Sequence, residues 1–203
     1  MMAAVQGQGG RANQKARTRQ ALVGACRELA RSGGEVTMAR VAELALVSEA
    51  TAYRYFPALA SLLWEVLEGL WPDPAQALAP VATSADPVER VTFACEYLLR
   101  GVHAYQGAVR AMISHTITAP SPARARPGIR FGLVDYALAP FGELAPGALT
   151  RLRQDLAMVV SAEAFFTLTD LCGLGAEDAI ASAARAAATL TRAAFAGPEG
   201  LTG

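Results

Sequence analysis

Aromatic residues and cysteine are scarce in this chain of 203 residues. Aromatic residues make up 7% of the sequence while 53% of it is hydrophobic, so a large core has to be built mainly from Ala, Leu and Val. Alanine also favours helices. The three cysteines, Cys26, Cys95 and Cys172, are an odd number, lie far apart and sit among apolar neighbours. We therefore expect buried, reduced thiols rather than a disulfide framework.

Long hydrophobic runs are absent as well. No run of about 18 apolar residues occurs, which argues against a membrane-spanning helix. The N-terminal sequence MMAAVQGQGG lacks the apolar core of a secretory signal. From these two observations we expect a cytoplasmic protein.

Motifs that carry catalysis or bind metals are also missing. The sequence has no glycine-rich phosphate loop, no nucleophile elbow and no Cys/His cluster with metal-ligand spacing. Its two histidines, His103 and His115, are twelve positions apart, and no carboxylate is paired with either at helical spacing. We therefore expect no enzyme, no metal site and no cofactor.

No segment alternates strictly between apolar and polar residues, which predicts an all-α protein. Caps, prolines and apolar periodicity predict about nine helices. The first three are expected from about residue 15 to 31, from Thr37, and from Ser48 to the stop at Pro57. The others are expected at about 58–70, 86–103, 108–118, 129–139, 146–172 and 176–196.

The segment from Val36 to Leu63, VTMARVAELALVSEATAYRYFPALASLL, is the most informative part of the chain. It predicts a helix, a tight turn and a second short helix, which is a helix-turn-helix that can place its second helix in a DNA major groove. The alternative is an ordinary bundle helix with two buried tyrosines, but the caps, the short helices and the basic flank RANQKARTRQ fit that alternative poorly.

Charge is distributed unevenly although the net charge is zero. Residues 1–60 hold eight Lys and Arg against four Glu, whereas residues 61–203 hold ten Arg against fourteen acidic residues. The basic excess therefore lies with the helix-turn-helix, where it would attract a polyphosphate. Taken alone, this difference in charge is equally compatible with DNA binding and with ordinary variation of a protein surface.

The residues VSEATAYRYFP from Val47 to Pro57, preceded by TMARVAELA from Thr37 to Ala45, resemble the TetR family of bacterial transcriptional regulators. This motif covers about a quarter of the chain, and the remainder matches by helical layout alone. The resemblance implies base readers at Ala39, Glu49 and Ala50. It implies further DNA contacts from Thr37, Arg40, Ser48, Thr51, Tyr53, Arg54 and Tyr55.

Two positions depart from the family's pattern. Leu46 stands in the turn where the family commonly has glycine, and a leucine resists the left-handed backbone. Leu59 stands where the family commonly has a lysine that contacts a phosphate, so this contact is absent. Arg17, Arg19 or Arg54 are candidates to replace it.

The larger C-terminal part is expected to dimerise through its last two helices. Apolar stripes run along both: Leu149, Leu152, Leu156, Val159 and Val160 on the first, and Ile180, Ala184, Ala187, Leu190 and Ala194 on the second. Two such helices from each subunit would form a four-helix interface. The alternative is that the stripes pack only against the core of their own subunit.

A small-molecule effector is expected to bind among aromatic and soft side chains of the middle helices, although each of these residues taken singly is more often part of a core than of a pocket. The candidates are Trp64, Phe93, Tyr97, His103, Met112, His115, Phe131, Phe165 and Phe166. Glu163 and Asp170 could form ion pairs with a cationic ligand or could lie on a solvated face.

The expected domains are a disordered tail over residues 1–14, a DNA-binding domain over 15–60, and a ligand-binding and dimerisation domain over 61–203. The expected function is that of a repressor that binds a palindromic operator as a homodimer and is released by an apolar or amphipathic effector. The alternative is a helical-bundle module for protein interaction or catalysis without DNA binding.

Overall fold

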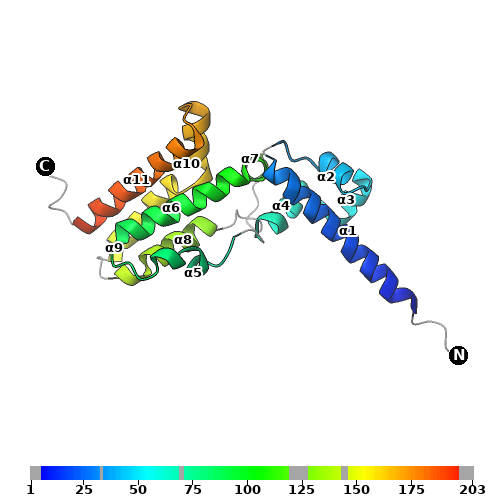
Figure 1. The fold of residues 1–203 in the computed structure, drawn as a ribbon, viewed down its shortest axis with the longest axis horizontal. Coiled ribbons are helices and arrows are strands. Elements are labelled where there is room, and N and C mark those ends of the chain that lie inside the picture. Colours follow the sequence, from blue (N-terminus) through cyan, green and yellow to red (C-terminus); the bar gives the residue numbers. More distant parts are fainter. Residues whose placement is uncertain (1–5, 33, 69–70, 119–127, 143–145, 197–203) are drawn as a thin grey trace. The chain divides into compact units, whose positions relative to one another are not determined.

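A computed structural model describes residues 6–32, 34–68, 71–118, 128–142 and 146–196 (Figure 1). Within these ranges every regular element is a helix and no strand occurs, which confirms the all-α prediction. The chain divides into two compact units, which are described separately. The first comprises Met1–Leu70 and Tyr105–Pro127, and the second comprises Trp71–Ala104 and Gly128–Gly203.

The first unit is built around the helix-turn-helix. Its core joins Leu22 and Cys26 to Val41, Phe56 and Leu63, all of them almost fully buried. A helix from the middle of the chain packs against both the first helix and the fourth, and it completes this core. The helices of this unit are α1 (Gln6–Arg31), α2 (Met38–Leu44), α3 (Glu49–Tyr55), α4 (Leu59–Glu68) and α7 (Gln106–Thr118).

The second unit is a bundle in which the last helix packs along α6 and α9, and α6 also packs against α8 (Figure 1). Its elements are α5 (Pro74–Ala77), the 3-10 turn η1 (Ala79–Val81), α6 (Pro87–Ala104), α8 (Ile129–Leu138), the 3-10 turn η3 (Ala139–Phe141), α9 (Pro146–Val159), α10 (Ala162–Phe166), the π-helical turn η4 (Thr167–Leu171) and α11 (Ala176–Ala196).

The helix starts follow the local chemistry that the sequence indicates. The Thr37 hydroxyl accepts a hydrogen bond from the Arg40 N–H, and the Ser48 hydroxyl accepts one from the Thr51 N–H. The Asp86 carboxylate accepts the Val88 N–H ahead of α6. These side chains satisfy N–H groups that have no partner within their helices, so they fix where the helices begin.

Two helix boundaries differ from the sequence prediction. The prediction of a disordered tail over residues 1–14 is wrong for residues 6–14, because α1 begins at Gln6, while residues 1–5 lie outside the described residues. Adding a turn to a helix that already exists costs far less than nucleating one, and no proline interrupts this segment. The single helix expected over 146–172 is also wrong, because the chain leaves the helix after Val159. Ser161 then caps α10 by accepting the Ala164 N–H.

The division into units differs from the expected domain boundary after residue 60. Helix α4 packs on α1 and α7, so it belongs with the helix-turn-helix. Helix α7 joins the same unit although α6, directly before it in the chain, belongs to the other. The α6–α7 junction at Ala104 and Tyr105 is therefore a covalent link between the units, as is the segment that follows α4.

Arg90 of α6 is the most deeply buried charged side chain among the described residues, with 2% of its surface exposed. Its guanidinium donates hydrogen bonds of 2.8–3.0 Å to four carbonyl oxygens, those of Val81, Ala82, Tyr136 and Ala137. These carbonyls lie at the ends of η1 and α8, where helices leave acceptors without internal partners. Arg90 thereby ties three elements of the second unit together.

The cysteines are only partly as expected. Cys26 and Cys95 are buried, and burial raises the pKa of each thiol to about 12, so both stay protonated near neutral pH. The expectation of a buried thiol is wrong for Cys172, which is exposed. Cys172 follows the π-helical turn, where the bundle's last hairpin reverses direction and the chain has little to pack against.

Candidate nucleic-acid interface

Helices α2 and α3 form a helix-turn-helix whose turn retains the left-handed geometry. Leu46 has a φ of +57°, which is the conformation that glycine adopts without cost. Its side chain is 92% exposed, so no packing offsets the strain. The turn therefore keeps its shape although the residue does not suit it, since the caps on both sides and the buried Val41 and Ala42 fix its ends.

Replacing Leu46 with glycine is expected to stabilise the first unit by roughly 0.5–1 kcal/mol. The left-handed region costs a side-chain-bearing residue about 1–2 kcal/mol, from which the larger unfolded-state entropy of glycine subtracts about 0.5–1 kcal/mol. Leu44→Gly is the matched control, because Leu44 is the last residue of α2 and should lose stability on the same change. Chemical denaturation measures the sign of the change in unfolding free energy for both variants. A Leu46→Gly variant that is less stable than the unmodified protein would show that the substitution does not release the strain.

The residues expected to contact DNA lie together at the starts of α2 and α3. Among the suggested base readers, Ala39, Glu49 and Ala50 are all exposed. Arg40 is exposed and donates a hydrogen bond to the Glu35 carbonyl, which holds its side chain beside the start of α2. This exposed, short-chained surface is what a helix needs in order to approach base edges in a major groove.

Hydroxyl groups flank that surface and are partly engaged within the motif. The Ser48 hydroxyl donates a hydrogen bond of 2.9 Å to the Thr51 hydroxyl and caps α3. Thr37 is half-buried and caps α2. These groups fix the backbone of both helix starts, and hydroxyl groups of this kind are common phosphate contacts.

The two tyrosines of α3 have packing roles opposite to those that the sequence suggests. From the sequence we expect the Tyr55 hydroxyl to face a phosphate, so that loss of the ring costs little stability, and the Tyr53 ring to pack partly in the small core. The structure instead leaves Tyr53 45% exposed, while Tyr55 packs against the core of the first unit. The Arg54 guanidinium lies 5.7 Å from the centre of the Tyr55 ring. The reason is the pitch of the short helix, which turns Tyr55, like Ala52 and Thr51, towards α1.

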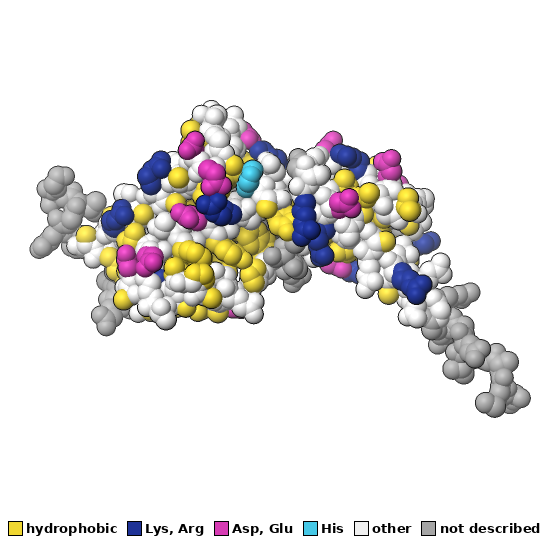
Figure 2. Space-filling view, viewed as in Figure 1, with side chains coloured by type: hydrophobic (Ala, Val, Ile, Leu, Met, Phe, Trp, Pro, Cys, Tyr) yellow, Lys and Arg dark blue, Asp and Glu magenta, His cyan; other side chains and the backbone are white. Residues whose placement is uncertain are grey.

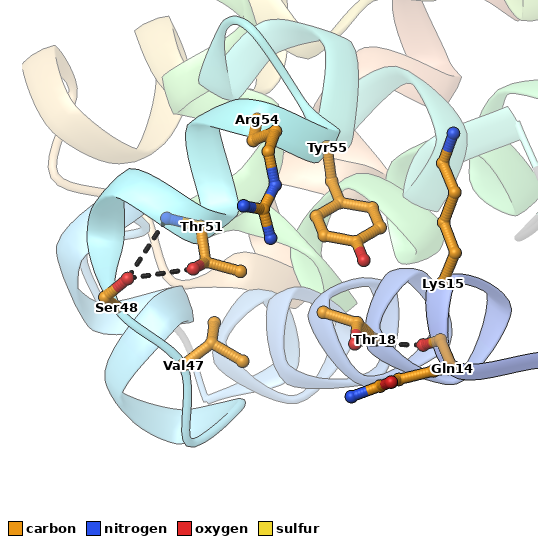
Figure 3. A pocket seen from close by; sticks show the side chains of 8 residues that line it. All are labelled: Gln14, Lys15, Thr18, Val47, Ser48, Thr51, Arg54 and Tyr55. Atoms are coloured by element: carbon orange, nitrogen blue, oxygen red, sulfur yellow. Dashed lines mark hydrogen bonds between the residues drawn. The ribbon is translucent and has the colours of Figure 1, made fainter. Parts of the chain in front are cut away.

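A groove of about 660 Å³ separates α3 from the N-terminal half of α1 (Figure 3). From α1 it is lined by Gln14, Lys15 and Thr18, which our sequence reasoning did not select individually. The turn and α3 supply the other lining residues, Val47, Ser48, Thr51, Arg54 and Tyr55. In Figure 3 the Arg54 and Tyr55 side chains project from α3 into the space beside α1. The i, i+1, i+4 spacing of these three residues indicates that they share one face of α1. That this face lies beside α3 can be seen only in the folded structure.

Three arginines could make the phosphate contact that Leu59 cannot make, and they differ in availability. Arg19 is engaged, since it pairs with Glu65 and lies 4.7 Å from the centre of the Phe56 ring. Arg54 lines the groove and Arg17 is exposed. Arg54 and Arg17 are therefore the two available candidates.

The suggested effector residues divide between the two units. Trp64 and Met112 pack in the core of the first unit, and His115 is half-buried on α7 of that unit. In the second unit the His103 ring lies 5.9 Å from that of Phe165, and Phe165 lies 5.6 Å from Phe166. The structure thus brings His103, Phe165 and Phe166 together as a cluster in the second unit, and Phe165 is a core residue.

Three further candidates lie elsewhere in the second unit. Tyr97 packs edge-on against Trp71 at 6.3 Å, and burial raises the pKa of the Tyr97 hydroxyl. Trp71 itself lies on Gly101, where an added Cβ would come within 2.1 Å of the indole. Phe93 is half-buried on α6, and Phe131 is exposed on α8 beneath the Arg153 guanidinium. Figure 2 shows hydrophobic side chains gathered over α5 and α8 on the visible face of this unit.

The apolar stripes chosen for dimerisation are used mostly within the chain itself. Leu156 and Ile180 are buried, and Ala187 has no exposed surface at all. Helix α11 packs this face on α6 and α9. A contact between subunits through the same helices would have to use their other faces, such as that of α9 on which Met158 is 74% exposed.

Comparison with known proteins adds one match. A crystal structure of a TetR transcriptional regulator from Rhodococcus sp. RHA1 superposes with a TM-score of 0.53 and 24% sequence identity, over 87% of this chain and 97% of that one. The chain has the TetR fold. Neither the protein-family models nor the curated proteins contain a match to this sequence.

The TetR fold confirms the architecture that the resemblance of Val47–Pro57 implied. Within the part of the chain that the structure describes, no helix is long and apolar enough to cross a membrane. The same part contains no group of three or more His, Cys, Asp or Glu side chains placed to hold a metal ion.

Proposed function

We propose that this protein is a transcriptional regulator that binds double-stranded DNA through α2 and α3. The observation that carries the proposal is the exposed start of α3, where Glu49, Ala50 and Tyr53 lie on a capped helix with Arg54 and the basic N-terminal half of α1 beside it. Small side chains at the tip and hydroxyls and cations at the edges are the arrangement of a recognition helix.

The regulator is proposed to act as a homodimer on a palindromic site. Two copies of α3 about 34 Å apart, or a multiple of this, would read successive major grooves on one side of the duplex. The last two helices remain the proposed interface, now through the face of α9 that carries Met158 and through Leu171 of the η4 turn before α11, rather than through the buried stripes.

We further propose that an apolar or amphipathic effector releases the protein from its DNA site. The protein would then act as a repressor, in the cytoplasm. An effector shifts the equilibrium between two states only through its different affinity for them. The second unit supplies the proposed site, with its aromatic residues Trp71, Tyr97 and Phe165. Quenching of Trp71 fluorescence in a Trp64→Phe background would report binding there, because Trp64 lies in the other unit.

Selection of genomic DNA fragments with the purified full chain tests the DNA-binding proposal. The expected result is a set of fragments sharing a palindromic sequence, with affinity that falls steeply as salt is raised. Fragments without a common sequence, or binding that does not depend on salt, would contradict an operator-binding regulator, and failure to retain any DNA would point to the module without DNA binding.

Variants of the two tyrosines separate DNA contact from packing. Tyr53→Ala is expected to weaken binding to the selected site about tenfold with little change in melting temperature, because the ring is exposed. Tyr55→Ala should lower both affinity and melting temperature, since its ring packs on the core, whereas Tyr55→Phe should lower affinity alone. Tyr136→Phe in the second unit is the control. Unchanged affinity in all the α3 variants would exclude α3 as the recognition helix.

A further inference from the structure

The N-terminal half of α1 extends beyond the core of its unit. The helix has 26 residues, yet Leu22 is its first buried side chain among those described. At a rise of 1.5 Å per residue, the part from Gln6 to Ala21 is about 24 Å long. Between residues 12 and 21 only Thr18 is half-buried, and the other side chains are exposed. Apart from Arg19, which pairs with Glu65 and lies on the Phe56 ring, this part of the helix adds little to the packing of the unit.

Its charge has a single sign. The first 27 residues contain five Lys and Arg and no Asp or Glu, and Lys15 is the only lysine in the chain. Arg19 is neutralised by Glu65. Lys15 and Arg17 are exposed, and neither has a carboxylate within ion-pair distance in the described part of the chain. Two cations without an ion-pair partner therefore lie on the part of α1 before Glu28, and this part contains no acidic residue.

The groove beside this helix has the chemistry of an anion site. Its lining offers the hydroxyls of Ser48, Thr51 and Tyr55 and the cations of Lys15 and Arg54, and none of the described residues that line it is a carboxylate (Figure 3). Hydroxyls and cations together suit phosphate oxygens, whereas an apolar effector would leave them without partners. Because the groove lies between α3 and α1, an anionic chain leaving α3 would pass along α1.

We propose that the N-terminal half of α1 is a second DNA-binding element, which holds the phosphate backbone outside the base pairs that α3 reads. One phosphodiester occupies the groove between α1 and α3, which Lys15 lines, and the next phosphate outward meets Arg17. The proposal rests on the DNA-binding function proposed above and adds an element that contributes affinity but not sequence preference. The bound segment on each side of the operator is consequently longer than the palindromic half-site.

The test compares two duplexes carrying the site selected from genomic DNA. One keeps about ten base pairs beyond each half-site and the other ends at the outermost conserved base pair. Each is titrated across a range of salt with the full-length protein, with Lys15→Gln/Arg17→Gln, and with Arg151→Gln/Arg192→Gln. The last variant removes two exposed arginines of the second unit. Light scattering confirms that all three have the same oligomeric state.

On the long duplex, the Lys15→Gln/Arg17→Gln variant should bind at least about tenfold more weakly than the unmodified protein. The slope of log K against log salt should be smaller by nearly two per subunit, at about 0.9 per phosphate. The loss should be equal on random DNA, and it should largely disappear on the short duplex. The control variant should match the unmodified protein throughout.

Two outcomes overturn the inference without touching the proposed function. One is an unchanged salt slope in the Lys15→Gln/Arg17→Gln variant while Tyr53→Ala still loses the site. The other is an equal loss on the long and short duplexes, which would place both residues inside the half-site. If the unmodified protein binds neither duplex, the DNA-binding function itself fails.

Discussion

Arg90→Met is expected to destabilise the second unit by roughly 3 kcal/mol or more. The substitution removes a buried guanidinium and leaves the carbonyls of Val81, Ala82, Tyr136 and Ala137 without the donors that now satisfy them. Each buried polar group that loses its partner costs about 1–3 kcal/mol. The stability of Arg90→Lys should lie between that of the unmodified protein and that of Arg90→Met. The lysine keeps the charge, but its ammonium cannot reproduce the four hydrogen bonds of the planar guanidinium.

Chemical denaturation of the Trp64→Phe background measures this effect, since Trp71 then reports on the second unit alone. Arg100→Met is the matched control: it removes an arginine from the same helix, but one that forms only an exposed pair with Glu177. Exposed pairs contribute about 0–1 kcal/mol, so its midpoint should hardly move. Equal midpoints for Arg90→Met and Arg100→Met would mean that the carbonyls find other donors.

Ala50→Glu is expected to reduce affinity for the selected operator at least about a hundredfold without changing the fold. Ala50 is exposed in the first turn of α3, where a carboxylate suits the helix. In a complex, the same carboxylate would face the negative potential of the DNA, and like charges brought together at an interface cost several kcal/mol. The stability and the affinity should therefore respond in different directions.

The control is Ala75→Glu, which changes an exposed alanine at the equivalent position of α5 in the second unit. Its operator affinity should equal that of the unmodified protein. Fluorescence anisotropy of a labelled duplex gives both affinities, and melting curves check both folds. An Ala50→Glu variant that binds with parent affinity would remove the start of α3 from the interface.

Local chemistry explains which parts of the fold could be predicted. Thr37, Ser48 and Asp86 cap helices through bonds to residues two or three positions away, so the sequence carries both partners. For the helices that these three residues cap, the starts agree with the prediction to within a few residues. The left-handed turn at Leu46 does not follow in this way, because a leucine resists that backbone and the sequence leaves the shape of the turn open.

Features that depend on distant partners could not be predicted. Arg90 donates hydrogen bonds to the carbonyls of Tyr136 and Ala137, and no sequence pattern around residue 90 predicts these acceptors. The stripes on α9 and α11 look the same whether they face a second subunit or α6, and only the fold shows that α6 covers α11. The break before α10 is a local feature that the sequence prediction missed, because apolar residues on both sides of Ser161 continue the helical period.

The candidate site shows the same division. The residues of α2 and α3 follow from one contiguous motif, and the structure leaves their expected contact surface exposed. Gln14, Lys15 and Thr18 enter the site only because α1 passes beside α3, more than thirty residues away in the chain. The aromatic residues chosen for an effector were selected by type alone, and the structure distributes them over two units.

Methylation protection on the selected operator tests most directly whether α3 reads DNA. Guanine N7 lies in the major groove, so a helix seated there shields it from the reagent. We predict protected guanines in two half-sites about ten base pairs apart, or a multiple of that spacing, and loss of the protection with Ala50→Glu but not with Ala75→Glu. Guanines that stay reactive at full occupancy of the duplex would contradict insertion of α3 into the major groove.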